Sequence, residues 1–398
     1  MTSADGVLTV GGGIAGLATA LTVARAGLTV RVLEQSSSFA EIGAGIELAP
    51  NATRVLRRLG LLEQVVAAGV TPRRLVLMSA VSGAELSSLD LGERFRARYG
   101  APYVVCSRND LLTALLEACH AEPRIALETD RDVTAVAGAA NDDEAATATC
   151  ADGTTYHAAG LIGADGLWSS VRPLRADDAP VCSGFVSYRG AIPLAEATHP
   201  APLDEVVAWI GPGLHFVQYA LREGELYNQV AVFRSDEYDA GVEEWGSPEE
   251  LDHTFAATCG EVREGLRAIK RDRRWYMYDR EPFDSWTAHR LTLVGDAAHP
   301  MLQYLAQGAC QAIEDAAALG DAIRQHTTAG SDIDGIPKAF LAYQEARAAQ
   351  AARVQRNARF WGDIWHTDGL AARLRDEILR MRAPDDYQHT DWLYHPVT

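Results

Sequence analysis

The sequence lacks three features that would mark a membrane or secreted protein. No apolar run approaches the ~20 residues that a membrane-spanning helix needs. The start, residues 1–6, is short and polar, unlike a signal peptide. The six cysteines are scattered, without C-x-x-C pairs or Cys/His spacing. We therefore expect a cytoplasmic protein with no metal site and no disulfide framework.

Basic residues are also in deficit. The 398 residues include 36 lysines and arginines against 54 aspartates and glutamates, a net charge of −18. This balance disfavours nucleic acid and anionic lipid as main partners, because both need basic surfaces. It does not exclude a small anionic substrate, because a local field can oppose the net charge. The length allows two or three structural units, and no internal repeat is present.

The first 34 residues form a complete βαβ pattern. An apolar strand at 7–10 is followed by Gly11, Gly13 and Gly16, spaced as G-x-G-x-x-G, then by a helix to 27 and a second strand ending at Glu34. The glycines allow a tight turn, close approach of a pyrophosphate and close packing of helix on strand. The helix N-terminus favours phosphate, and the terminal acid suits a ribose hydroxyl. The pattern predicts a dinucleotide-binding domain.

The rest of the chain predicts an α/β fold in three parts. Residues 1–180 and 284–335 would form a discontinuous, Rossmann-like domain, and the β-rich segment 181–283 an inserted, mainly antiparallel sheet for substrate. Residues 336–398 are expected to be mostly helical. The order of strand, glycine turn and helix seen at the beginning occurs again later in the chain. It consists of a strand at 290–294, the turn G-D-A-A-H-P at 295–300 and a helix starting near Gly308. The loop at 43–52 either presses backbone against a flat ligand or is an ordinary connection.

Two strands of the inserted sheet carry polar and aromatic residues with a period of two. In the first strand, 214–221, His215, Val217 and Tyr219 share one face. In the next strand, 226–233, Gln229 shares a face with Tyr227, Ala231 and Phe233. Such a sheet face either covers a pocket or is solvated.

Three motifs, in this order, resemble those of the single-component flavoprotein aromatic hydroxylases, which share the para-hydroxybenzoate hydroxylase-like fold. They are G-G-G-I-A-G at 11–16, G-A-D-G at 163–166 and G-D-A-A-H-P at 295–300, and Y-Q-E-A-R at 343–347 also fits. The resemblance implies non-covalent FAD as cofactor, NADH or NADPH and O2 as co-substrates, and a homodimer. The cofactor contacts that it implies are Gly11, Gly13, Ile14, Ala15, Gly16, Glu34, Gln35, Gly45, Ile46, Arg108, Val133, Asp165, Gly295, Asp296, Pro300, Gly308, Ala309 and Cys310.

Within this family, the segments at 210–219, 228–233, 277–282, 300–306 and 390–394 are most similar to 3-hydroxybenzoate 6-hydroxylases. This resemblance implies conversion of 3-hydroxybenzoate to 2,5-dihydroxybenzoate through a flavin C4a-hydroperoxide. Three alternatives stay open: a decarboxylating hydroxylase of the salicylate or hydroxynicotinate type, a tailoring hydroxylase of a larger aromatic, and a flavin-binding protein without turnover. One departure is Glu47, where a neutral or basic residue is expected close to the ring.

The implied chemistry needs a base, because a phenol titrates near pH ~10 and reacts far better as phenolate. His215 is the candidate base, since an imidazole titrates near ~6.5; the alternative is a structural histidine. Tyr219 and Gln303 would fix the substrate ring. Arg189 either grips a substrate carboxylate or is structural, and His299 is expected to order its loop. Further walls of the substrate pocket would come from Glu47, Tyr103, Tyr188 and Gln229.

Overall fold

A five-stranded parallel sheet forms one end of the molecule. The computed structural model describes residues 6–40, 45–139, 145–327 and 333–395. The strand order is β17-β11-β1-β2-β7, and every neighbouring pair is parallel. Three of its strands, β17, β11 and β1, are fully buried because helices cover the sheet. The strands are β17 (Leu291–Leu293), β11 (Gly160–Gly163), β1 (Gly6–Val10), β2 (Thr29–Leu33) and β7 (Ile125–Glu128).

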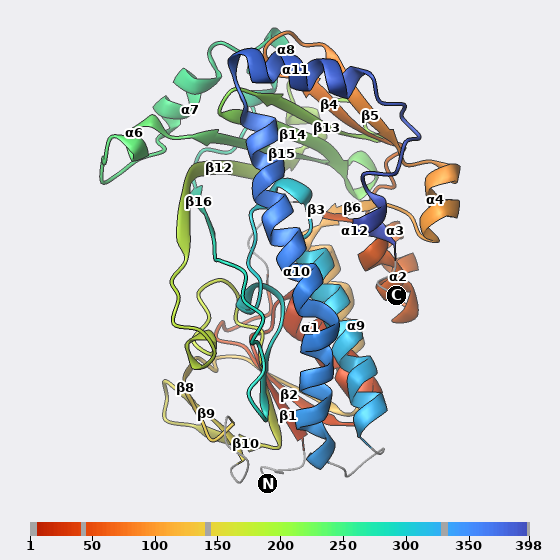
Figure 1. The fold of residues 1–398 in the computed structure, drawn as a ribbon, viewed down its shortest axis with the longest axis vertical. Coiled ribbons are helices and arrows are strands. Elements are labelled where there is room, and N and C mark those ends of the chain that lie inside the picture. Colours follow the sequence, from red (N-terminus) through yellow and green to blue (C-terminus); the bar gives the residue numbers. More distant parts are fainter. Residues whose placement is uncertain (1–5, 41–44, 140–144, 328–332, 396–398) are drawn as a thin grey trace.

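Three long helices pack together beside this sheet. Helix α1 (Ile14–Arg25) follows the glycine turn and packs against α9 (Gly308–His326), which in turn packs against α10 (Ile336–His366). Figure 1 shows α10 running along the molecule from the parallel sheet toward the opposite end. The predicted Rossmann-like βαβ unit is confirmed, and the separate helix expected near Gly308 begins at that residue.

A seven-stranded sheet forms the other end of the molecule (Figure 1). Its order is β16-β12-β15-β14-β13-β4-β5, and only the β13–β4 pair is parallel. The predicted, mainly antiparallel sheet is therefore present. The strands are β16 (Arg274–Asp279), β12 (Val181–Pro193), β15 (Leu226–Arg234), β14 (Leu214–Leu221), β13 (Glu205–Gly211), β4 (Arg74–Ser79) and β5 (Glu85–Asp90).

The boundaries of this sheet differ from a simple insertion at 181–283. Strands β4 and β5 come from much earlier in the chain, and β4 extends the sheet by pairing with β13. A parallel pairing between strands so far apart in sequence has no local signal, because no turn joins the two strands. The predicted inserted segment, 181–283, therefore contains five of the seven strands of this sheet.

The two faces of the large sheet have different cover. On one face, helices α7 (Pro248–Phe255) and α8 (Gly260–Leu266) contribute Phe255 and Val262 to a core with Phe216 and Phe233. On the other face, the end of α10 and α11 (Gly369–Arg380) pack near β13 and β15. This second face borders the cavity described below.

Smaller elements complete the fold. A three-stranded sheet has the order β10-β9-β8, and β3 pairs with β6. Within the described ranges, no helix combines the length and apolarity needed to cross a bilayer.

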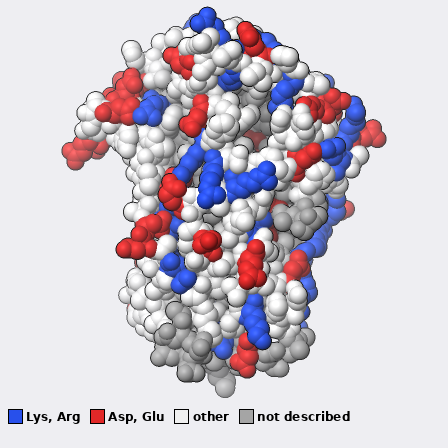
Figure 2. Space-filling view, viewed as in Figure 1, with Lys and Arg blue, Asp and Glu red and all other residues white. Residues whose placement is uncertain are grey.

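On the face shown in Figure 2, acidic and basic side chains are interspersed. The remaining elements are β3 (Gly45–Leu48), β6 (Val104–Ser107), β8 (Val133–Ala137), β9 (Ala146–Cys150), β10 (Thr155–Ala158), α2 (Pro50–Arg58), α3 (Leu62–Ala67), α4 (Glu93–Tyr99), α5 (Arg108–His120), α6 (Asp236–Asp239) and α12 (Asp391–Tyr394).

Candidate active site

A cavity of about 1480 Å³ lies where the two sheets meet. Its wall includes the start of α1, the start of α9, one face of the seven-stranded sheet, and α10 and α11. A single small-ligand pocket measures ~300–1,000 Å³, so this cavity has room for more than one ligand. Both glycine turns of the sequence analysis therefore open onto one space.

The first glycine turn is built for close backbone approach. Gly11 has φ +102°, which a side chain disfavours. A Cβ on Gly16 would lie 1.9 Å from the Gly11 carbonyl oxygen, so only glycine fits between strand and helix. Gly13 precedes α1 and lines the cavity, and no side chain caps the helix there. The amide groups of this helix start fit an anionic phosphate group.

Glu34 lies beside this turn, at the end of β2. Its two carboxylate oxygens accept hydrogen bonds from the backbone N–H of Gly12 and of Ser36, each at 2.8 Å. The acid predicted to hold a ribose is therefore fixed next to the glycines. Its neighbour Gln35 is exposed and does not line the cavity.

The second glycine turn is held by a buried His–Asp–Arg cluster. His299 Nε2 lies 2.5 Å from Asp315 Oδ2, and both side chains are fully buried. Asp315 also accepts from the Gly295 N–H and from Arg347 Nε. Burial alone would raise the pKa of Asp315, but His299 and Arg347 lower it to about 2. His299 thus orders its loop, as expected, and Asp296 follows at the cavity wall.

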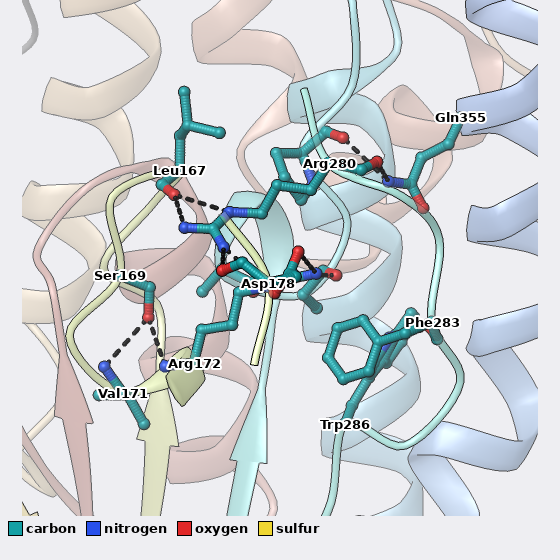
Figure 3. A network of polar contacts seen from close by, with 12 residues as sticks. Leu167, Ser169, Val171, Arg172, Asp178, Arg280, Phe283, Trp286 and Gln355 are labelled. Carbon is teal, nitrogen blue, oxygen red and sulfur yellow. Dashed lines mark hydrogen bonds and ion pairs between the residues drawn. The ribbon is translucent and has the colours of Figure 1, made fainter. Parts of the chain in front are cut away.

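A network centred on Asp178 fixes the same loop from the other side (Figure 3). Asp178 accepts hydrogen bonds from Arg172 and Arg280. Arg172 also donates to the carbonyls of Ala297 and Ala298, both at 2.8 Å. The buried guanidinium therefore holds backbone oxygens of the 295–300 turn.

Two further contacts of this network reach separate elements (Figure 3). Arg280 donates to the Leu167 carbonyl. Gln355 of α10 donates to the carbonyls of Arg280 and Pro300. Because these contacts join three segments distant in sequence, the network ties α10 to both loops of the cofactor side.

Nine of the eighteen predicted cofactor residues line the cavity, and the other nine do not. Asp165 accepts from Ser169 Oγ at 2.6 Å and from the Ser170 N–H at 2.7 Å, so it caps its own turn. Val133 packs into the core, and Cys310 Sγ lies against the backbone of residues 47 and 49. The lining residues are Gly13, Ile14, Ala15, Gly45, Ile46, Arg108, Asp296, Gly308 and Ala309. The others are Gly11, Gly16, Glu34, Gln35, Val133, Asp165, Gly295, Pro300 and Cys310.

His215 and Tyr219 line the cavity together, from alternate positions of β14. Burial lowers the pKa of His215 well below its ordinary value, and the neighbouring imidazole of His366 lowers it further. Burial also raises the pKa of Tyr219, and the charge of Glu47 raises it further. At neutral pH the site therefore presents a neutral imidazole and a neutral phenol.

Two predicted pocket residues need correction. Tyr188 donates to the Gly246 carbonyl at 2.7 Å, and Gln229 donates to the Gly265 carbonyl at 2.8 Å; neither lines the cavity. In β15, Asn228 pairs with Tyr219 and so shares its face. The sequence shows which residues alternate within each strand, but the turn fixes the register between strands. The even-numbered residues of β15, rather than Gln229, therefore face the cavity.

Glu47 and Tyr103 face each other at the cavity wall. Tyr103 Oη donates to Glu47 Oε2 at 2.5 Å. Burial raises the pKa of Glu47, although the Tyr103 hydrogen bond opposes this rise. Gln303, in the turn at Gln303–Leu305, also lines the cavity. Glu47 thus points inward rather than to solvent.

Three lining residues and one residue behind the cavity wall have no signal in the sequence. The Tyr304 hydroxyl, the Trp365 indole N–H and the Asn228 amide nitrogen are buried without a hydrogen-bond partner among the described residues. His366 Nε2 lies 2.8 Å from His215 Nδ1, although the two residues are 151 positions apart. Such a distant pairing arises only when α10 packs against β14.

Comparison with known proteins gives consistent results. A family model described as "FAD binding domain" matches residues 5–358. The 3-hydroxybenzoate 6-hydroxylase of Polaromonas naphthalenivorans is 38% identical over 98% of this chain and 95% of its own length. A 3-amino-4-hydroxybenzoate 2-monooxygenase of Streptomyces platensis, PtnB3, is 37% identical over 98% of this chain and 95% of its own length.

Solved structures show the same fold at lower identity. Klebsiella pneumoniae HpxO, complexed with FAD and uric acid, aligns with a TM-score of 0.84 at 24% identity, covering 100% of this chain and 99% of the other. A salicylate hydroxylase substrate complex aligns with a TM-score of 0.79 at 22% identity, covering 100% and 97%. With the glycine turns, the fixed acid and the shared cavity, these matches show that the chain belongs to the FAD-binding family as a single-component FAD-dependent aromatic hydroxylase.

Proposed function

We propose that the protein hydroxylates 3-hydroxybenzoate para to its hydroxyl group, giving 2,5-dihydroxybenzoate. The observation that carries this proposal is the cavity wall at β14, where His215 and Tyr219 face the space bordered by both glycine turns. Relatives named 3-hydroxybenzoate 6-hydroxylase match almost the whole chain at 37–38% identity. Bound FAD, reduced by NADH or NADPH, supplies the reactive oxygen atom from O2.

The fit of FAD rests on the two helix starts that open onto the cavity. Gly13, Ile14 and Ala15 would hold the phosphates at α1, and Asp296 with Gly308 would hold the part of the cofactor at α9. A cavity of about 1480 Å³ leaves space beyond one small ligand for a single-ring acid. The apolar part of its wall excludes water from the reacting ring.

His215 would accept the phenolic proton. Its lowered pKa keeps the imidazole neutral, so a nitrogen lone pair is available. Tyr219 and Gln303 would orient the substrate ring by hydrogen bonds. Burial raises the pKa of Glu47 despite the opposing hydrogen bond from Tyr103, which favours a neutral carboxyl that does not repel an aromatic acid.

A second candidate is hydroxylation of a related aminohydroxybenzoate. It is favoured by relatives named 3-amino-4-hydroxybenzoate 2-monooxygenase, at 36–37% identity over 98% of this chain. A decarboxylating reaction has weaker support, from a 6-hydroxynicotinate 3-monooxygenase of Bordetella bronchiseptica at 33% identity. The three reactions give products of different mass.

The test is NADH and NADPH oxidation across a panel of these acids, with the products identified by mass spectrometry. We expect 3-hydroxybenzoate to stimulate oxidation most and to gain one oxygen atom without loss of CO2. His215→Ala should keep its FAD but lose hydroxylation by roughly 10²–10⁴-fold, or divert electrons to H2O2. Gln229→Leu, on the opposite sheet face, is the matched control. Full coupled turnover in His215→Ala would exclude His215 as the base.

We also infer a cytoplasmic homodimer. All six cysteines are free thiols, which fits a reducing compartment. A row of apolar side chains on α10 and α11 is exposed, including Phe360, Leu374 and Ile378, and such a row suits a subunit contact. Light scattering would test the dimer, and cell fractionation the location.

A further inference from the structure

Two histidines from distant segments meet edge to edge at the cavity. His215 belongs to β14 and is 1% exposed, whereas His366 is the last residue of α10 and is half-buried. The facing nitrogens, Nδ1 of His215 and Nε2 of His366, are 2.8 Å apart, while the ring centroids are 5.1 Å apart and the planes differ by 21°. Stacked rings cannot approach closer than ~3.5 Å, so this contact is an in-plane hydrogen bond.

One ring of this pair donates and the other accepts. Burial lowers the pKa of His215 well below its ordinary value, and burial with the charge of Arg375 lowers the pKa of His366 to about 3. Both imidazoles are therefore neutral at neutral pH, and each carries one N–H. If His215 donates from Nδ1, its Nε2 is a bare acceptor. If His366 donates instead, His215 carries its proton on Nε2 and cannot act as a base from that atom.

No carboxylate of the described residues competes for a nitrogen of either ring. Within the described residues, neither ring makes an ion pair or a hydrogen bond with an acid. One face of the His366 ring stacks on Phe185, at 4.6 Å between centroids. Tyr304 and Trp365 contact His215 through ring edges.

Charged groups near the pair come from four elements. Arg375 of α11 donates to the carbonyl of Trp365 and pairs with Asp376. Arg234 of β15 lies over the Phe185 ring, and Asp363 of α10 and Asp279 of β16 lie within electrostatic reach of Tyr304. Asp279 is itself paired with Arg359. The second imidazole is thus the only group among the described residues that hydrogen-bonds the His215 ring.

We propose that His366 is a positioning residue for the hydroxylation: it accepts the hydrogen bond of His215 Nδ1–H and so holds His215 in the tautomer whose Nε2 takes the substrate proton. This inference rests on the proposed function. In the step, the phenolic O–H bond breaks and an N–H bond forms at His215 Nε2, giving a phenolate and an imidazolium. The imidazolium keeps its Nδ1–H bond to His366, whose lone pair stabilises the positive charge. His366 touches the base and not the substrate.

The experiment compares His366→Phe, which keeps an aromatic ring but has no acceptor, with His366→Gln, whose amide oxygen can accept from Nδ1–H. His253→Gln, at an exposed position of α7, is the control. We expect kcat for coupled hydroxylation of 3-hydroxybenzoate to fall roughly 10–100-fold in His366→Phe, with little change in KM. His366→Gln should recover most of this loss. Equal loss in both variants, or no loss in His366→Phe, would overturn the proposal.

A second readout needs no substrate. In the FAD-loaded enzyme labelled with nitrogen-15 histidine, the ring shifts of His215, assigned with His215→Gln, report which nitrogen carries the proton. We expect a protonated Nδ1 and a bare Nε2 in the wild type and in His366→Gln, and a changed tautomer in His366→Phe. A wild-type His215 with its proton on Nε2 refutes the inference. If the expected tautomer is found but 3-hydroxybenzoate is not hydroxylated, the proposed function fails while the histidine pairing stands.

Discussion

The histidine pair makes the stability of the protein sensitive to mild acid. The pKa of His366 is lowered from its ordinary 6.5 to about 3 in the folded protein, first by burial and then by Arg375. A histidine with a lowered folded pKa takes up its proton more readily in the unfolded chain. The contribution of His366 to the unfolding free energy is therefore fully present above pH 6.5, and it is lost as the pH drops toward 3.

The size of this effect follows from the shift. One pKa unit is worth ~1.36 kcal/mol, and pH 5 lies 1.5 units below the ordinary pKa of 6.5. Protonation of His366 in the unfolded chain at pH 5 therefore lowers the unfolding free energy by at most about 2 kcal/mol. His215 acts in the same direction, because its pKa is also lowered by burial. Glu47 acts in the opposite direction, since its raised pKa favours protonation of the folded state as the pH falls.

The comparison of wild type with His366→Phe isolates the contribution of His366, because the other groups are common to both proteins. We would measure urea unfolding of the FAD-loaded enzymes at pH 8 and pH 5. The wild type should lose up to about 2 kcal/mol more unfolding free energy between these pH values than His366→Phe does. His253→Gln should behave as the wild type, since His253 is exposed. Equal losses in wild type and His366→Phe would refute the reasoning.

Three further changes test the scaffold around the site. Asp178→Asn should destabilise the fold by roughly 1–3 kcal/mol, because Arg172 and Arg280 lose a partly exposed carboxylate and keep only an amide oxygen as partner; chemical denaturation measures this loss. Gly16→Ala should abolish retention of FAD, read from the flavin absorbance of the purified protein, because a Cβ there has no space; a fully yellow variant would contradict this close packing. Gln229→Leu should leave KM and kcat unchanged while lowering the melting temperature, since its amide bonds the Gly265 carbonyl away from the cavity; a raised KM would return Gln229 to the substrate site.

Local patterns determined the βαβ unit and much of the cofactor side. Gly11 and Gly16 stand where a positive φ and a 1.9 Å approach leave no room for a Cβ, and Glu34 ends the strand beside them. Period-two alternation likewise put His215 and Tyr219 on one face of β14. These features depend on neighbours a few residues apart, so the sequence alone specifies them.

Tertiary structure decided what depends on distant partners. The register between β14 and β15 turned Asn228 rather than Gln229 toward the cavity, and β4 joined the sheet by a parallel pairing that has no local turn. The partner of His215 came from the end of α10, 151 residues away. Alternation determines which face of its own strand a side chain occupies. Only the packing of separate elements determines which side chains meet. Contacts between distant segments contribute free energy only after the chain has closed the long loops between them.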